Sequence, residues 1–471
     1  MPTPWTLDED RCFSPEPAVR DRARELYAHV RGLPLVCPHG HVPPDLLADP
    51  EARFGDPAEL LITPDHYVFR MLYSQGVPMQ DVGVPTRDGS ATERDHRAVW
   101  RRLCENFHLF RGTPTGLWLK AELIELFGVR EKPTAANADA LYDQVQARLQ
   151  QDDFRPRALF ERFDIEMLAT TDAATDDLDA HARIRADGLP VRPTFRPDAL
   201  MKLTDPSWQE ALELLQERTG REIIDLTSFT EAIWSRRAYF QERGATASDH
   251  GVQDPLVAPL PASEAEALFT RALDGRADED DQARFHGHML FEMAGMARED
   301  GLVMQVHAGS FRDHHPRVYD RFGPDKGADI PIAVDWTRGL HALLNEHGFD
   351  PAFRLIVYTL DESTYARELA PLAGHYPALR LGAPWWFYDS VLGMDRYLDR
   401  VVETAGIYNL AGFNDDTRAF PSIPTRHDVW RRTSANWLAG MTARGLIDED
   451  DAPDMAHWLA YGAAKDAYRL A

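Results

Sequence analysis

The sequence predicts an α/β fold, a (β/α)8 TIM barrel with a helical insertion after the first strand. Eight short apolar runs end in polar residues, and helical patterns separate most of them. Continuous apolar runs are typical of buried parallel strands, and intervening helices imply crossover connections. Eight such units make up a barrel of this kind. An open, doubly wound sheet is the alternative that these patterns leave.

The predicted strands follow one another along the chain, with one long interval after the first. They are residues 33–38 (LPLVCP), 165–171 (IEMLATT), 189–195 (LPVRPTF), 244–249 (GATASD), 302–307 (LVMQVH), 353–359 (FRLIVYT), 378–383 (ALRLGA) and 406–413 (GIYNLAGF). The third run contains two prolines and the fourth consists of small and polar residues, so these two have the weakest strand patterns.

The long interval predicts a separate helical part. Residues 42–160 hold amphipathic patterns such as ATERDHRAVWRRLCENFHLF and no clear strand. We therefore expect three parts: residues 1–41 with the N-terminal segment and first strand, a mainly helical insertion at 42–160, and the rest of the barrel with C-terminal helices at 161–471. Some loops of the insertion are expected to fold over the barrel mouth.

Charge and composition limit the function. The formal net charge of −25 argues against a nucleic-acid binder and against a polybasic membrane contact. No apolar run is long enough to span a membrane, the first residues lack the pattern of a secretory signal, and three cysteines have no metal-type spacing. A cytoplasmic protein is expected. An anionic substrate would need local arginine, lysine or metal charge to bind.

Two His-x-His pairs occur. In a chain of this length with 18 histidines, nearly one such pair is expected by chance. His39 and His41 follow a strand-like run, whereas His286 and His288 lie in a segment with helical periodicity. Residues i and i+2 share a face on a strand but not on a helix. Only the first pair can therefore place two ring nitrogens about 2.0–2.1 Å from one Zn²⁺-like ion.

Polar residues just after strand ends are the candidates for chemistry, because active sites of such barrels lie at that face. They are His39, His41, Thr171, Asp172, Arg196, Asp249, His250, His307, Asp361, Trp385, Trp386, Asp415, Asp416 and Arg418. Asp416 would supply the carboxylate that a site of two histidines lacks, although an aspartate in a polar loop is often only a cap or turn residue. Arg418 could hold an anion or stabilise an oxyanion.

Three further segments carry candidates. In ITPDHYVFR, His66 and Tyr67 place an imidazole beside a phenol, although a helix start with Tyr67 half buried would explain them equally well. Arg312 follows the fifth predicted strand in QVHAGSFRDHH. The pair Trp385 and Trp386 follows a strand too, and its position allows a ligand platform as well as a core contact.

Taken in order, these motifs resemble one family. The blocks PHGHV, PDHYVFR, ATTDAATDDLDAH, PTFRPD, SDHG, QVHAG, PWWF and DDTR are similar to those of the uronate isomerases in the amidohydrolase superfamily, from about residue 10 to about residue 440. The resemblance implies a distorted (β/α)8 barrel that interconverts D-glucuronate with D-fructuronate and D-galacturonate with D-tagaturonate. It implies one divalent metal ion, expected to be Zn²⁺, bound by His39, His41 and Asp416.

The resemblance also supplies the rest of the predicted site. The residues that match its active-site lining are Arg418, His66, Tyr67, Arg196, His307, Trp385 and Trp386, to which Arg312 is added as a substrate contact. Two stretches depart from the family pattern, CPHGH in the first strand and AGSFRDHH after the fifth. They bear on the subgroup and the preferred sugar more than on the reaction.

The chemistry can be rebuilt from the residues. A uronate must be gripped by its carboxylate and ring-opened before a proton moves from C2 to C1. We expect Asp416 to carry that proton, Arg418 and the metal to stabilise charge on the oxygens, and His66 or Tyr67 to move protons during ring opening. A hydride shift from C2 to C1 is the rival route.

Two other functions stay open at this point. A metal-dependent hydrolase on the same scaffold would attack an amide, ester or lactone with metal-bound water, and His307 could then be an extra ligand. A non-catalytic sugar-acid sensor would bind without turnover. The sequence leaves open the metal, the preferred uronate and whether the chain forms a homo-oligomer.

Overall fold

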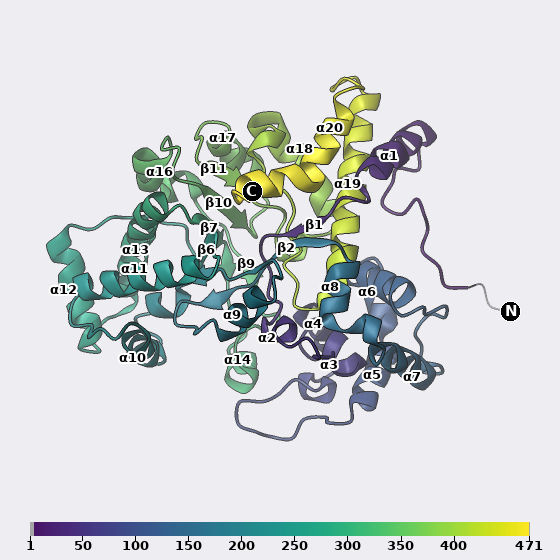
Figure 1. The fold of residues 1–471 in the computed structure, drawn as a ribbon, viewed down its shortest axis with the longest axis horizontal. Coiled ribbons are helices and arrows are strands. Elements are labelled where there is room, and N and C mark those ends of the chain that lie inside the picture. The colour runs from purple at the N-terminus through teal and green to yellow at the C-terminus, as the bar shows by residue number, and fades with distance from the viewer. Residues whose placement is uncertain (1–3, 471) are drawn as a thin grey trace.

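The computed structural model describes residues 4–470, and its centre is a ring of short parallel strands (Figure 1). The strands of the ring are β1 (Leu35–Cys37), β2 (Ile165–Ala169), β3 (Asp172–Ala173), β4 (Val191–Arg192), β5 (Phe195–Arg196), β6 (Ala247–Gly251), β7 (Val303–Ala308), β10 (Leu355–Thr359) and β11 (Leu379–Leu381). A small antiparallel pair, β8 (Ser310–Phe311) and β9 (Ile330–Pro331), lies in the loop after β7.

Strand order around the ring follows chain order. One sheet has the order β1-β2-β4 and the other β11-β10-β7-β6-β5-β3. β2 and β3 continue along one barrel strand, as do β4 and β5, because backbone hydrogen bonds join the two runs from Leu168 to Ala174. The two weakest predicted strands, at 189–195 and 244–249, thus both contain strand residues.

The eighth predicted strand is only partly correct. Residues 407–409 form a 3₁₀ turn, and Leu410 makes a single bridge to Leu381 instead of a ladder. Gly412 interrupts the extended backbone with φ +74°, and a Cβ on it would lie 2.5 Å from the nitrogen of Ala464. The strand is therefore interrupted where Gly412 lies against the C-terminal helix α21 (Ala463–Ala467), and the barrel is distorted at that point.

Helices surround the strands on the outside (Figure 1). Those after β3 are α9 (Asp179–Ala186), α10 (Trp208–Thr219), α11 (Leu226–Glu242), α12 (Ala262–Leu273), α13 (Glu279–Asp300), α14 (Pro316–Phe322), α15 (Trp336–Gly339), α16 (His341–His347), α17 (Ala370–Ala373) and α18 (Val391–Ala405). Shorter helical turns are η4 (Asp198–Met201), η5 (Tyr365–Leu369), η6 (Trp386–Tyr388), η7 (Ile407–Asn409), η8 (Phe420–Ser422) and η9 (Trp458–Gly462). His286 and His288 lie on α13, as their periodicity predicts.

The first helix of the chain packs against C-terminal helices beside the barrel. The N-terminal helix α1 (Pro17–Val30) packs along α19 (Ile423–Ala443), which is followed by α20 (Ala452–His457) and α21 (Ala463–Ala467). Figure 1 shows α1 next to the long C-terminal helix α19. Within residues 4–470 no helix is long and apolar enough to cross a membrane.

The segment between β1 and β2 is helical and forms the lower right part of Figure 1. Its elements are α2 (Asp45–Ala48), α3 (Pro57–Leu61), α4 (His66–Ser74), η1 (Met79–Val82), α5 (His96–Glu105), η2 (Phe107–Phe110), α6 (Pro114–Glu125), α7 (Ala138–Leu149), η3 (Asp152–Phe154) and α8 (Pro156–Arg162). Most of a second hydrophobic cluster, with Trp100, Phe110 and Phe154 fully buried, comes from this segment. The domain boundaries at residues 41 and 160 stay a prediction.

Candidate active site

A cavity of about 420 Å³ opens at the carboxyl ends of the barrel strands. Five of the residues that follow predicted strands do not line it: Thr171, Asp172, His250, Asp361 and Asp415. All the side chains of the predicted site do line it. Those side chains are His39, His41, His66, Tyr67, Arg196, His307, Arg312, Trp385, Trp386, Asp416 and Arg418. They come from loops after different strands and from the helical segment between β1 and β2. The fold therefore brings them together, while their individual roles stay predictions.

His39 and His41 follow β1 and face the same carboxylate. Their Nε2 atoms lie 3.5 Å and 3.2 Å from Oδ1 of Asp416, without hydrogen-bond geometry. Asp416 is placed there by an unusual backbone, with φ +44° in the left-handed region. Two imidazoles and one carboxylate at these separations form a group that could hold a metal ion.

A second group shares His39. Oδ1 of Asp249, in β6, lies 2.6 Å from Nδ1 of His307, in β7, and the His307 ring lies 4.7 Å from the His39 ring. Nε2 of His307 has no hydrogen-bond partner among the described residues. A carboxylate on one ring nitrogen orients the imidazole and leaves the other nitrogen for a ligand. This geometry suits His307 either as a further ligand or as a substrate contact.

The residues present fit a divalent cation. Buried Oδ1 of Asp416 lacks a hydrogen-bond partner within residues 4–470, as does Nε2 of His307. The carboxylates lining the cavity also outnumber the cationic groups: Asp198, Asp205, Asp249, Asp313, Asp325 and Asp416 against Arg196, Lys202, Arg312 and Arg418. A bound cation would offset this excess of negative charge and give the two unpartnered atoms a ligand contact.

The protonation states suit metal ligands too. Burial lowers the pKa of His39 to about 4, so its ring is neutral at neutral pH. Burial alone would raise the pKa of Asp416, but the adjacent His41, with His39 and His307, holds it below the ordinary value. Neutral imidazole and ionised carboxylate are the forms that bind metal.

His66 and Tyr67 form the first turn of α4. The side chain of Asp65 caps this helix by accepting a hydrogen bond from the Tyr67 backbone N–H at 2.8 Å. Burial and the nearby Arg418 lower the pKa of His66 to about 3. Tyr67 is 5% exposed rather than half buried, and its hydroxyl donates to Oδ2 of Asp389 at 3.2 Å. Tyr67 therefore both lines the cavity and contacts a buried carboxyl.

The two tryptophans are both core and lining. Trp385 and Trp386 are 7% and 5% exposed, and each still faces the cavity. Nε1 of Trp385 donates to Oδ2 of Asp416 at 3.1 Å, which holds the carboxylate oxygen that the histidines do not face. Trp386 meets the His66 ring edge-on at 4.9 Å.

Comparison with known proteins decides the family. The family model described as glucuronate isomerase matches residues 18–468. The chain belongs to the glucuronate isomerase family. The uronate isomerase of Nostoc punctiforme is 56% identical over 465 residues, covering 98% of each chain.

Solved structures of the family have the same fold. The glucuronate isomerase of Caulobacter crescentus matches with a TM-score of 0.97 at 46% identity, over 99% of this chain and 98% of that one. The uronate isomerase of Thermotoga maritima matches with a TM-score of 0.90 at 28% identity, over 98% and 99%. The predicted family, its place in the amidohydrolase superfamily, the distorted barrel and an isomerase as enzyme class are all confirmed.

In this member of the glucuronate isomerase family, the three cavity arginines already have carboxylate partners, which their sequence positions do not indicate. Each forms an ion pair with an aspartate: Arg196 with Asp198 at 2.9 Å, Arg312 with Asp329 at 3.0 Å and Arg418 with Asp325 at 3.2 Å. The partners come from neighbouring loops that apolar patterns do not register.

Two further side chains of the cavity, Asp249 and Lys202, lie outside the predicted site. Asp249 is a candidate by its position after a predicted strand, and its bond to His307 gives it a place in the site. Lys202 has no such position, because it lies beyond the turn η4 that follows β5. It lines the cavity and forms no ion pair in the described part of the chain. Scanning one turn past each strand end would have found it.

Proposed function

We propose that this chain interconverts aldose and ketose forms of hexuronates in the cavity, D-glucuronate with D-fructuronate and D-galacturonate with D-tagaturonate. The observation that carries the proposal is the ionised Asp416 between His39 and His41, with Arg418 two residues later, in a chain of the glucuronate isomerase family. A base, an oxyanion partner and a metal-type group in one cavity match what this isomerisation needs.

Asp416 is the proposed carrier of the migrating proton. Its carboxylate takes the proton from C2 of the open-chain aldehyde, which leaves an enediolate, and the resulting acid returns it to C1. A second proton passes from O2 to O1, so the ketose has the same atoms as the aldose. Arg418 stabilises the negative charge on these oxygens while the enediolate exists.

His39, His41 and Asp416 are the proposed ligands of the metal, with His307 as the candidate for a fourth position. A divalent ion bound there, proposed to be Zn²⁺, would supply Lewis-acid stabilisation of charge on the substrate oxygens and a fixed template for binding. The tetrahedral preference of Zn²⁺ for nitrogen and carboxylate ligands supports this choice.

Ring opening is assigned to His66 and Tyr67, which differ in protonation. The low pKa of His66 makes its ring a neutral acceptor, while burial raises the pKa of Tyr67 well above its usual value and keeps its phenol protonated. One residue can therefore take a proton from the anomeric hydroxyl as the other gives one to the ring oxygen.

The substrate carboxylate needs positive charge at the cavity wall. Lys202 is the proposed main contact because it has no competing ion pair within residues 4–470, and Arg196 and Arg312 line the cavity with it. Trp385 and Trp386 present flat apolar faces suited to the sugar ring. The hexuronate is the proposed small-molecule partner, cytoplasmic location stays a prediction, and homo-oligomer formation is left open.

A two-substrate assay tests the proposal. Purified protein is incubated with glucuronate and with galacturonate, after chelation and after restoring Zn²⁺, in deuterated water. We expect the matching ketose from at least one substrate, with solvent deuterium at C1 because the Asp416 acid exchanges its proton with the solvent before returning it in part of the turnovers. Conversion without deuterium would favour a hydride shift, and no conversion of either sugar would refute the function.

A further inference from the structure

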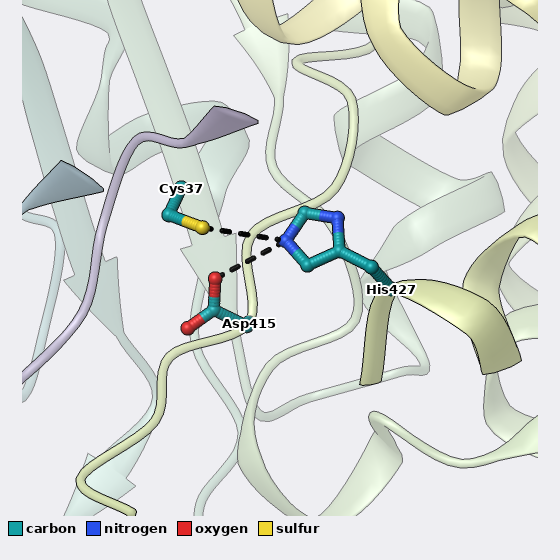
Figure 2. Close-up of side chains that lie close together, drawn as sticks. All are labelled: Cys37, Asp415 and His427. Carbon is teal, nitrogen blue, oxygen red and sulfur yellow. Dashed lines mark hydrogen bonds and ion pairs between the residues drawn. The ribbon is translucent and has the colours of Figure 1, made fainter. Parts of the chain in front are cut away.

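Next to Asp416 in the chain, Asp415 meets two other buried side chains, Cys37 and His427, from distant parts of the chain (Figure 2). Cys37 is the last residue of β1, Asp415 precedes the proposed base, and His427 lies on α19. Nε2 of His427 lies 3.6 Å from Sγ of Cys37 and 3.2 Å from Oδ2 of Asp415. The group therefore ties β1, the loop after residue 410 and a C-terminal helix together.

This group adjoins a strained piece of backbone. The left-handed φ of +44° at Asp416 is disfavoured for residues other than glycine, and such strain persists only where the surroundings hold it. The carbonyl of Asp415 accepts from Nη1 of Arg426 at 3.0 Å, and the carbonyl of Thr417 accepts from the His41 N–H at 3.0 Å. Asp416 is thus anchored through both of its neighbours.

We propose that Asp415 and His427 are positioning residues, which hold the strained turn so that the Asp416 carboxylate points at His39 and His41. Cys37 contributes from the other segment, because it ends β1 and lies two residues before His39. One buried contact thus sets the end of the strand that the histidines follow against the loop that carries the carboxylate. The inference rests on the role proposed above for Asp416.

A second metal site would use the same three donors, since thiolate, imidazole and carboxylate all bind Zn²⁺. Two guanidinium groups argue against it. Arg426 donates to the Asp415 carbonyl, and the charge of Arg431 acts on both Cys37 and His427. Positive charge beside the group disfavours a dication and favours a hydrogen-bonded clamp on Asp415.

The test uses two substitutions at one position. His427→Leu removes the ring nitrogen, whereas His427→Gln can place an amide nitrogen near it and restore a donor to Asp415. We expect His427→Leu to weaken Zn²⁺ binding, measured by chelator competition, and to lower kcat by about tenfold or more, with little change in KM. His427→Gln should recover most of both losses.

His347→Gln is the matched control, because His347 is also buried but lies on α16, away from the cavity. It should lower the thermal midpoint of the metal-free protein without changing Zn²⁺ affinity or kcat. If His427→Leu does not fold, Asp415→Asn gives the same measurement with less change in shape.

Three results would overturn the inference. His427→Leu could match His347→Gln in Zn²⁺ affinity and kcat, which would show that the contact only stabilises the fold. Cobalt-substituted protein could hold two ions per chain and show a thiolate charge-transfer band that Cys37→Ser removes, which would show a second metal site. Wild-type protein that neither binds Zn²⁺ nor converts a uronate would refute the proposed function first, and the clamp with it.

Discussion

Carboxyl groups on the two sides of Tyr67 have opposite protonation. On the cavity side, the histidines beside Asp416 hold its pKa below the ordinary value. On the inner side, burial raises the pKa of Asp389 to about 7 and that of Glu122 to about 8. The carboxyl group of Asp416 in the cavity is thus an anion at neutral pH, whereas those of Asp389 and Glu122 on the inner side are partly or largely neutral.

The difference comes from what each carboxyl can pair with. Arg426 is the cation of the inner side, and it stacks on Trp118 at 3.8 Å while pairing with Asp389 at 3.2 Å. Glu122 is left with Oε2 unpartnered in the described part of the chain. Divergent pKa values of neighbouring groups often mark divided acid and base roles, so the ionised carboxylate is the one to test as the base.

Replacing the ionised carboxylate should have the largest effect. Asp416→Asn removes the proposed base and one metal ligand, so we expect kcat to fall by about 10² to 10⁴. Steady-state kinetics at saturating Zn²⁺ measures it, with bound metal determined on the same sample. Near-normal turnover by a variant that still binds Zn²⁺ would show that Asp416 is not the base.

Asp389→Asn is the control from the inner side. Its amide resembles the neutral acid and can still accept the hydrogen bond from Tyr67. We expect a loss of less than about tenfold, much smaller than that of a catalytic base. If Asp416→Asn and Asp389→Asn lowered kcat equally, the comparison would fail, because the protonation state of the carboxyl would not predict its role.

The histidines that set the charge of Asp416 can be tested against their counterparts on α13. His39→Ala combined with His41→Ala should abolish measurable Zn²⁺ binding and, with it, activity, because a site of three protein ligands is reduced to one. His286→Ala with His288→Ala should leave Zn²⁺ affinity unchanged and affect only stability. Isothermal titration of both proteins with Zn²⁺ separates the outcomes, and a loss of affinity in the second would contradict the assignment.

Local sequence patterns are enough to distinguish His39 and His41 from His286 and His288. An apolar run before His39 predicts a strand, and the spacing around His286 predicts a helix, so the periodicity of neighbours separates the two pairs. The strands β7 and β10 were equally visible because they are continuous apolar runs buried on both faces.

Long-range contacts account for what the sequence did not predict. The eighth strand is interrupted at Gly412, against which Ala464, some fifty residues later in the chain, packs closely. The pairing of Arg418 with Asp325 and the clamp of Asp415 by His427 likewise join segments with no shared periodicity. Such contacts follow from the assembled fold, so a single sequence read by local pattern cannot supply them.

The smallest expected effect is on the free energy of unfolding. It reports the burial of a carboxyl group that has no proposed role in catalysis. Glu122 has a pKa of about 8 in the folded protein against an ordinary value of 4.5. Between these pH values the folded state binds more protons than the unfolded state, so the free energy of unfolding falls as pH rises. The full interval corresponds to several kcal/mol at most, at roughly 1.4 kcal/mol per pH unit.

Glu122→Gln removes this loss of unfolding free energy at higher pH, because the amide stays neutral at every pH. Its urea midpoint should resemble that of the wild type at pH 5 and exceed it by a growing margin up to pH 8. Glu213→Gln, an exposed position on α10, should show no such trend. A margin independent of pH would mean that Glu122 is ionised in the folded protein. Arg426 would then neutralise both inner carboxyls, and the contrast with Asp416 would rest on geometry alone.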